Sequence, residues 1–314
     1  MKLYWAIQWR RNEGLGALFA VLAGFLVLYA VLFPGILSLS GAGRFVQNWF
    51  PMALVAVAQT VVMLTGGIDL SVGAMVGLGS VVAATTMTGA LGVTGGTALT
   101  IGMGAGVGTA VGLIVAVGRY PAIIVTLATS FIIGGAALLI LPRPGGEIPT
   151  GVSDFLAGEH PTAVFLLVLL ILAWKLYQAS PLGMALVAAG DNLTGAFRSG
   201  MPTRTARILA YALSGALQAA AGLYVAAQTG SGDPVIGGPF TLAAIAAAVL
   251  GGVSFLGGQG TLRGALAGSL LMSVLINVMF FLNMPPVAQY VVQGLIIVVT
   301  VALPRFRQML RRIA

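Results

Sequence analysis

The feature that most constrains this chain is a series of long apolar segments that carry almost no charge. Several of them reach about 18 residues or more, the length that an α-helix needs to cross about 30 Å of hydrocarbon. Only 7% of all residues are charged, too few to cover the surface of a soluble domain. The sequence therefore predicts an all-α, polytopic membrane helical bundle that forms one transmembrane domain over residues 1–314. Ten candidate spans lie near 15–34, 46–65, 70–88, 96–117, 121–141, 162–179, 205–228, 240–257, 262–282 and 287–303.

The basic residues predict the orientation of these spans. With a cytoplasmic N-terminus, ten crossings place thirteen of the 15 Lys and Arg residues inside and only Arg44 and Arg143 outside. This positive-inside bias predicts that both termini are cytoplasmic, and it accounts for the net charge of +8 without nucleic-acid binding. If residues 46–88 enter the membrane and return on the same side, eight spans remain and the bias is unchanged.

The motif GGIDLSVG, Gly66 to Gly73, interrupts two apolar runs. Gly66 and Gly67 break the helix, and Asp69 stands where the next helix begins. As an N-cap, the Asp69 carboxylate would accept hydrogen bonds from the amides near Ser71. An acid at a broken helix inside a membrane also marks a transport path. Asp69 is therefore expected either to cap a discontinuous helix or to contact the solute.

A small set of uncharged amides inside the predicted spans suits a neutral polyhydroxy solute, because amides both donate and accept hydrogen bonds. The alternative is that each amide only packs between helices. The near absence of charge within the spans argues against an ion-coupled carrier. The candidate substrate pathway consists of Asn48, Gln59, Gly66, Gly67, Asp69, Ser71, Asn277, Gln289 and Gln293.

Glycine spacing predicts close helix packing and an internal repeat. In the fourth span, Gly102/Gly106 and Gly104/Gly108 are small-xxx-small pairs of the kind that lets helices approach. The double glycines within 247–268 resemble the break at Gly66-Gly67, which suggests a second broken helix in that region.

The polar stretch 180–204 is expected to form a short cytoplasmic helix between two turns, bracketed by Pro181 and Pro202. Asp191 or Asn192 supplies an N-cap, and Gly200 a C-terminal stop. A helix outside the membrane offers a surface for a partner protein.

Several chemistries are excluded by missing residues. The chain has no G-x-x-x-x-G-K-[ST] sequence, so it cannot bind ATP through a P-loop. It has no cysteine and one histidine, His160, which excludes disulfides and multi-histidine metal sites. No G-x-S-x-G or histidine-based catalytic set is present. We therefore expect neither an enzyme nor a bound metal or cofactor.

Nearly the whole chain resembles the ribose-type ABC sugar permease family. The resemblance lies in the residues around GGIDLSVG (56–78), in 182–201, in 206–234, in 242–261 and in 291–303. Phe197-Arg198 departs from the family pattern, in which a small or basic residue precedes an apolar one. The ATPase-contacting residues implied by the resemblance are Gly190, Asp191, Asn192, Ala196, Arg198, Ser199 and Gly200.

The resemblance implies an importer of the bacterial inner membrane with several partners. These are a second permease subunit, identical or paralogous, a cytoplasmic ABC ATPase that binds ATP and Mg²⁺, a periplasmic sugar-binding protein, and membrane lipid. The expected solute is a monosaccharide, a pentose or a hexose. An autoinducer sugar, inositol or a nucleoside are the alternatives within the class, and an ATPase-independent secondary carrier is the alternative outside it.

Overall fold

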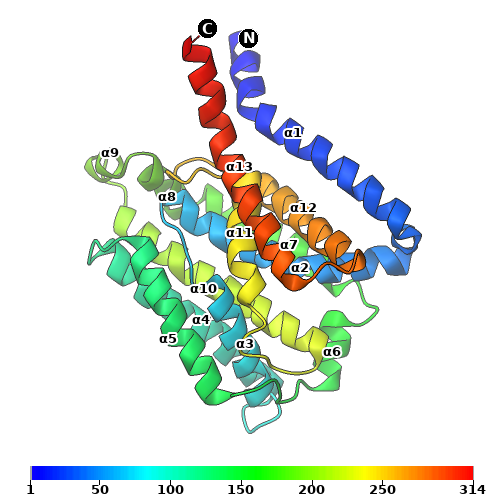
Figure 1. Cartoon of the computed structure of the whole chain (residues 1–314). Helices are drawn as coiled ribbons and strands as arrows, with labels where there is room; N and C mark the ends of the chain where they lie inside the picture. Colours follow the sequence, from blue (N-terminus) through cyan, green and yellow to red (C-terminus); the bar gives the residue numbers. More distant parts are fainter. Residues whose placement is uncertain (1, 314) are drawn as a thin grey trace.

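The computed structural model describes residues 2–313, so Met1 and Ala314 of the predicted domain lie outside it. The described chain is helical, with thirteen α-helices and one 3-10 helix (Figure 1). The helices are α1 (Lys2–Leu32), η1 (Pro34–Leu37), α2 (Leu39–Leu64), α3 (Val72–Thr86), α4 (Gly92–Ala116), α5 (Ala122–Ile140), α6 (Thr150–Ala157), α7 (Thr162–Ala179), α8 (Pro181–Asp191), α9 (Leu193–Arg198), α10 (Thr203–Thr229), α11 (Gly238–Leu250), α12 (Leu262–Phe281) and α13 (Pro286–Ile313).

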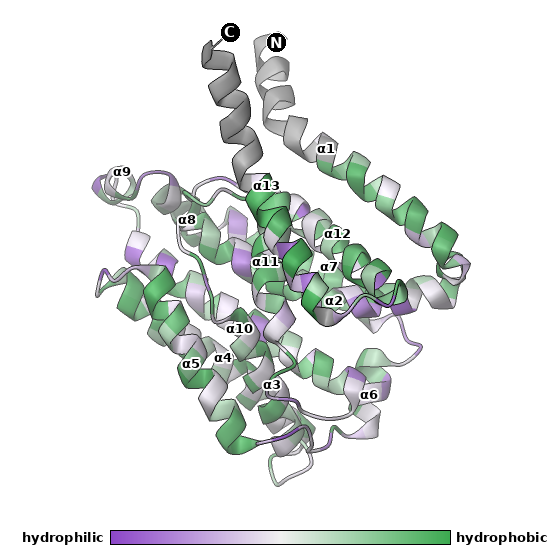
Figure 2. Ribbon diagram, in the orientation of Figure 1, coloured by the Kyte–Doolittle hydropathy of each residue, from purple (hydrophilic) through white to green (hydrophobic). Residues whose placement is uncertain are grey.

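Within the residues whose placement the structure describes, six helices are long and apolar enough to cross a membrane: α2, α4, α5, α7, α10 and α12. Shorter apolar stretches lie in α1, α3, α8, α11 and α13. Hydrophobic residues cover the helices, and hydrophilic ones collect mainly in the connections and at helix ends (Figure 2). All ten predicted segments coincide with helices, although the segment 240–257 is helical only to Leu250. The number of crossings remains a prediction.

The centre of the bundle is the antiparallel pair α2 and α10, and α4 packs closely against α10. A side chain on Gly104, Gly108 or Gly112 would overlap backbone atoms of α10, whereas Gly102 and Gly106 face open space. Only one of the two predicted small-residue pairs therefore packs. Gly112 is the third glycine of this contact. It follows Gly108 by four residues, and residues four apart share a helix face.

Gly108→Val is expected to destabilise the bundle by about 1–3 kcal/mol, because the new side chain must displace the backbone of α10 at Tyr211. Gly106→Val is the matched control, since no heavy atom lies within 4 Å of a Cβ at that position. Thermal unfolding of the purified protein in detergent measures the difference. Equal melting temperatures for the two variants would contradict the observed α4–α10 contact.

The short helices α3 and α11 each follow a segment outside the long helices, 65–71 before α3 and 230–237 before α11. Their first turns meet at Gly73 and Gly237, where a Cβ on either residue would overlap the carbonyl oxygen of the other. The Gly73 amide also donates to Thr241 Oγ1 at 3.0 Å. Two broken helices thus abut by their N-termini.

These broken helices belong to an internal repeat with an offset of 164 residues, the separation of Gly73 from Gly237. The same offset carries α2, α3, α4 and α5 approximately onto α10, α11, α12 and α13. It also matches two aspartate turns: Asp69 Oδ1 accepts from the Ser71 amide and Asp233 Oδ1 from the Val235 amide, both at 2.9 Å. Because α2 and α10 run antiparallel, the two halves have opposite orientations.

The repeat was therefore predicted from the sequence, but the second segment was paired wrongly with the first. The predicted partner for Gly66-Gly67 was the glycine-rich region 247–268, whereas the structure matches the segment before α3 with residues 230–237. The double glycines at 251–252 and 257–258 follow α11 instead. Glycine pairs misled the comparison, because the geometry that the two halves share is an aspartate turn followed four residues later by a glycine contact.

Candidate transport and coupling site

The segment 65–71 holds the one carboxylate that sequence reasoning placed inside the membrane. The side chain of Asp69 is buried, and its Oδ1 accepts from the Ser71 amide at 2.9 Å and from Ser71 Oγ at 2.6 Å. Helix α3 begins at Val72, immediately after this turn. Asp69 therefore orders the chain before α3 through an aspartate turn. It accepts the predicted bond from the Ser71 amide, but the N-cap position itself is occupied by Ser71, whose side chain makes no cap hydrogen bond.

The second carboxylate oxygen of Asp69 binds α10. It accepts from Gln218 Nε2 at 2.8 Å and faces Ser214 Oγ at 3.4 Å, and Gln218 Nε2 also reaches Ser214 Oγ at 2.8 Å. Gln218 and Ser214 are fully buried. Because its two carboxylate oxygens bond different elements, Asp69 is a structural link between the segment 65–71 and α10.

Sequence reasoning missed Ser214 and Gln218, and also Tyr211, whose hydroxyl is buried and would overlap a Cβ on Gly67. These three residues share one face of α10 because they are spaced by three and four positions. A polar stripe at helical spacing in an otherwise apolar span was the available signal. Selecting amides one at a time, without regard to helix faces, misses such a stripe.

Among the described residues, no hydrogen bond joins the other predicted pathway residues to Asp69, apart from Ser71. Gln59 on α2 and Gln293 on α13 are buried without a hydrogen-bond partner for their amide atoms among the described residues. Asn48 is exposed in the first half of α2, where its Oδ1 lies 3.4 Å from Gln228 Nε2. Asn277 and Gln289 are half-buried, towards the end of α12 and the start of α13. Gly66, Gly67, Asp69 and Ser71 lie together in the segment 65–71.

The stretch 180–204 contains two helices, α8 and α9, where the sequence predicted one. Of the two predicted caps, Asn192 is the one used: its Oδ1 accepts from the Gly195 amide at 2.8 Å. Gly200 ends the helix with a φ of +79°, a conformation that favours glycine. Ala196 is buried, while Asp191, Asn192, Arg198, Ser199 and Gly200 are exposed. We call α8 and α9 the coupling segment.

Asn192→Ala is expected to fray α9, because removal of an N-cap costs about 1 kcal/mol. Hydrogen–deuterium exchange of residues 193–198 should accelerate, with little change in α10. Thr194→Ala, which alters an exposed residue of α9 that is not the cap, is the control. Unchanged exchange in Asn192→Ala would show that the cap does not hold this helix.

The coupling segment touches the broken-helix site through glycines. A Cβ on Gly190, in α8, would overlap the carbonyl oxygen of Leu64 and lie 2.5 Å from the Gly258 amide. The Gly258 amide in turn donates to the Leu64 carbonyl at 3.0 Å. A Cβ on Gly257 would lie 2.7 Å from the Gly66 amide and 2.9 Å from the Gly190 carbonyl. We call these four glycines, 66, 190, 257 and 258, the glycine junction.

The glycine junction joins three parts of the chain that are far apart in sequence: the end of α2, the end of α8 and the loop after α11. Three of its members, Gly66, Gly257 and Gly258, have φ values of +79°, +90° and +69°. Backbone therefore packs on backbone, without flexible side chains between. A displacement of α8 bears directly on the loops of both halves of the repeat.

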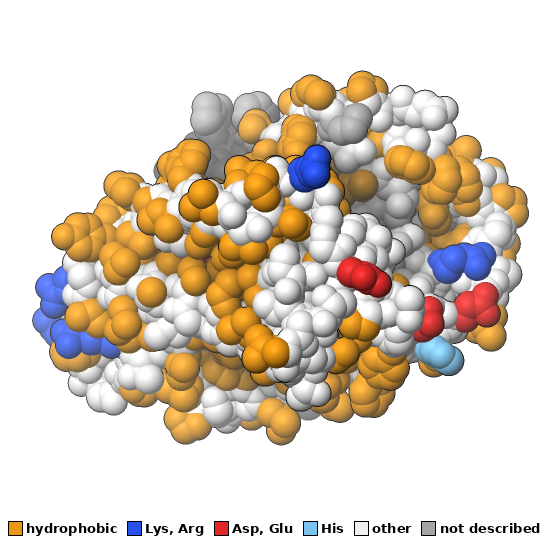
Figure 3. Space-filling view, turned by 90° about the horizontal axis from the view of Figure 1, so that it is seen from below, with side chains coloured by type: hydrophobic (Ala, Val, Ile, Leu, Met, Phe, Trp, Pro, Cys, Tyr) orange, Lys and Arg blue, Asp and Glu red, His pale blue; other side chains and the backbone are white. Residues whose placement is uncertain are grey.

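Charged side chains of the described residues collect towards the two ends of the bundle. Figure 3 shows Lys and Arg side chains gathered at one end, and the acidic and histidine side chains with fewer basic ones towards the other. Hydrophobic side chains cover much of the surface between them. This arrangement fits a bundle that crosses a membrane, and the positive-inside rule predicts that its basic end is cytoplasmic.

A charge-poor helical bundle with an inverted repeat and two opposed broken helices is the construction of a membrane transporter. Residues 43–301 match the family described as "Branched-chain amino acid transport system / permease component". The chain belongs to this family of permeases and is a multi-pass protein of the inner membrane. As a member, it is a transport subunit rather than an enzyme.

Similar proteins share one name, "Autoinducer 2 import system permease protein LsrC". That of Klebsiella pneumoniae subsp. pneumoniae is 35% identical over 311 residues, which cover 96% of this chain and 89% of the relative. That of Enterobacter sp. strain 638 is 34% identical over 312 residues, 96% and 90% of the two chains. That of Yersinia pestis strain Pestoides F is 32% identical over 255 residues, 78% and 72%. The comparison with solved structures found no significant match.

Proposed function

We propose that this chain is the permease subunit of an ABC importer that carries a small sugar or sugar-like solute across the inner membrane. One observation carries the proposal: the glycine junction joins the coupling segment to the segment before α3 and to the loop after α11. A surface outside the membrane that has direct backbone contacts to these loops can transmit the movement of another protein to them. The sequence lacks a P-loop, so that work must come from a separate ATPase, which binds the ATP and Mg²⁺.

The proposal includes a second permease subunit, identical or paralogous. Within the described residues, the meeting point of α3 and α11 is closed by contact between Gly73 and Gly237. Around it, residues such as Val72, Ala243 and Ala244 pack in an apolar core. A polar solute would find few hydrogen-bond partners there, which favours a path between two permease subunits over one through a single chain.

In the proposed cycle, a periplasmic binding protein delivers the solute at the end of the bundle that carries α6. ATP binding moves the ATPase subunits and, with them, the coupling segment. The glycine junction passes that movement to residues 65–71 and to the loop after α11. Opening then alternates from the outer to the cytoplasmic side.

Reconstitution in liposomes tests this function. The chain is combined with its second permease subunit, its ATPase and its binding protein, and both ATP hydrolysis and solute uptake are measured. We expect uptake only with all components and hydrolysis that rises with the loaded binding protein. Uptake that persists without the ATPase and follows an ion gradient would favour a secondary carrier instead.

The names of the relatives favour an autoinducer sugar among the candidate solutes, since the similar permeases are named for autoinducer 2 import. Pentoses, hexoses, inositol and nucleosides form the comparison set. The cognate binding protein selects the solute before it reaches the permease, so its melting temperature should rise with the correct ligand. If the melting temperature rises with a pentose or hexose but not with autoinducer 2, the solute is an ordinary monosaccharide.

A further inference from the structure

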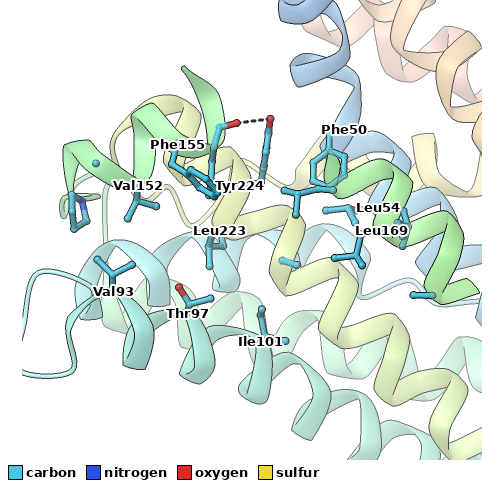
Figure 4. A pocket seen from close by; sticks show the side chains of 17 residues that line it. Phe50, Leu54, Val93, Thr97, Ile101, Val152, Phe155, Leu169, Leu223 and Tyr224 are labelled. Atoms are coloured by element: carbon cyan, nitrogen blue, oxygen red, sulfur yellow. Dashed lines mark hydrogen bonds between the residues drawn. The ribbon is translucent and has the colours of Figure 1, made fainter. Parts of the chain in front are cut away.

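A cavity of about 740 Å³ lies beside the core, away from the broken helices. Its walls come from α4, α6, α7 and α10 and from the middle of α2 (Figure 4). Helix α7 packs mainly against α2, α6 and α8, so the cavity separates it from α4. The volume is that of a ligand site rather than a packing defect.

The lining excludes water and sugar as occupants. Of the seventeen residues shown in Figure 4, Thr97 and Tyr224 alone have polar side chains. The Tyr224 hydroxyl already donates to the Leu156 carbonyl at 2.9 Å. A water molecule needs two to four polar partners, and apolar cavities stay dry. A sugar would leave its hydroxyl groups without hydrogen bonds.

The surroundings of the cavity are hydrocarbon. Exposed apolar side chains of both α4 and α7 line it, including Val93, Ile101 and Leu169. Both helices are long and apolar enough to cross the membrane, and only 33% of α4 and 17% of α7 is buried in the bundle. In an inner-membrane protein, these exposed faces meet lipid acyl chains. An empty cavity would deprive its lining of dispersion contacts.

We infer that an acyl chain of a membrane phospholipid enters between α4 and α7 and fills this cavity. Such an acyl chain matches the apolar lining, needs no hydrogen bonds and is the solvent at the opening. The site goes beyond contact of lipid with the outer surface, because the acyl chain reaches α10 at Ala220 and Leu223. It also supports α7, the helix that leads through Ser180 directly into the coupling segment.

Spin labels test the occupant directly, because the chain has no cysteine and a single thiol can be placed at will. Thr97→Cys and Ala220→Cys put a label on different walls of the cavity. Leu139→Cys, 87% exposed on α5, serves as the lipid reference, and Asp191→Cys on the coupling segment as the water reference. Collision rates with oxygen and with a water-soluble nickel complex are measured in phosphatidylethanolamine–phosphatidylglycerol vesicles.

We expect both cavity labels to match the Leu139→Cys label, with high oxygen and low nickel collision rates. High nickel rates would mean a water-filled cavity, and low rates for both reagents an empty or protein-filled one. Either result overturns the inference. Neither depends on transport, so the test is separate from that of the proposed function.

A second measurement avoids any label. Ala220→Phe fills the floor of the cavity, and Leu139→Phe places the same ring on the open surface of α5. Native mass spectrometry of the purified chain should show one phospholipid fewer on Ala220→Phe than on the wild type or on Leu139→Phe. Equal lipid retention by all three proteins would count against the acyl-chain site.

Discussion

Gly190→Leu is expected to abolish solute uptake by the assembled importer while ATP hydrolysis continues. Any side chain at this position would overlap the Leu64 carbonyl and approach the Gly258 amide. Accommodation requires α8 to move away from both loops, since neither obstacle is a flexible side chain. The coupling segment would then still meet the ATPase, but its movement would no longer reach residues 65–71 or the loop after α11.

The two readouts distinguish this effect from misfolding. Overpacking typically costs about 1–3 kcal/mol, so the variant should melt at a lower temperature yet remain folded. Gly190→Ala should give the same uncoupling in weaker form. Gly106→Ala is the matched control, because its methyl group meets open space. If Gly190→Leu takes up as much solute per ATP hydrolysed as the wild type, the glycine junction does not transmit the movement of the coupling segment.

The second large effect concerns the bond between Asp69 and Gln218. Asp69→Leu is expected to destabilise the protein by several kcal/mol, because each buried donor left without a partner costs about 1–3 kcal/mol. The amide and the hydroxyl of Ser71 would both lose their acceptor, and Gln218 Nε2 would keep only Ser214 Oγ. Asp69→Asn should be milder. A rotation of the Gln218 amide group would present Gln218 Oε1, which has no partner now, to the new amide donor at position 69.

Exchange of the two groups supplies a sharper test. Gln218→Glu alone places a second carboxylate against Asp69 in a buried site and should be strongly destabilising. The double variant Asp69→Asn with Gln218→Glu restores one donor and one acceptor and should recover most of the melting temperature. No recovery in the double variant would mean that the two side chains do not stabilise each other.

The same series decides between the two roles expected of Asp69. If Asp69 only links residues 65–71 to α10, uptake should follow melting temperature across the variants, including its recovery in the double variant. If Asp69 also contacts the solute, Asp69→Asn and the double variant should raise the KM for uptake while the fold is intact. Because Asp69 is buried and its carboxylate bonds both Ser71 and Gln218, we expect the first result.

The glycine junction illustrates why the site was only partly predictable. Sequence reasoning selected Gly66 for the substrate pathway and Gly190 for the ATPase contact, as members of separate sites. The structure makes them neighbours through Gly257, and Gly258 was not selected for either. Glycine identity indicates that a close approach is needed, but it does not say which backbone approaches.

Residue type and spacing were sufficient for the features that depend on local chemistry. Apolar runs without charge specify membrane helices, and the distribution of Lys and Arg predicts their orientation. Asn192 caps α9 through the amide three residues further on, and Asp69 turns the chain at Ser71 two residues further on. Such contacts form wherever the local backbone permits, so they could be predicted without knowledge of the rest of the fold.

Which distant groups meet was settled by helix packing. Asp69 takes its second set of donors from α10, 145 and 149 residues further along the chain. Gly104 and Gly108 pack while Gly102 and Gly106 do not, and residues 65–71 pair with 230–237. Inside a nearly uniform apolar bundle many helix arrangements bury similar hydrophobic area. The choice among them depends on shape and on a few buried hydrogen bonds, which a one-dimensional pattern does not contain.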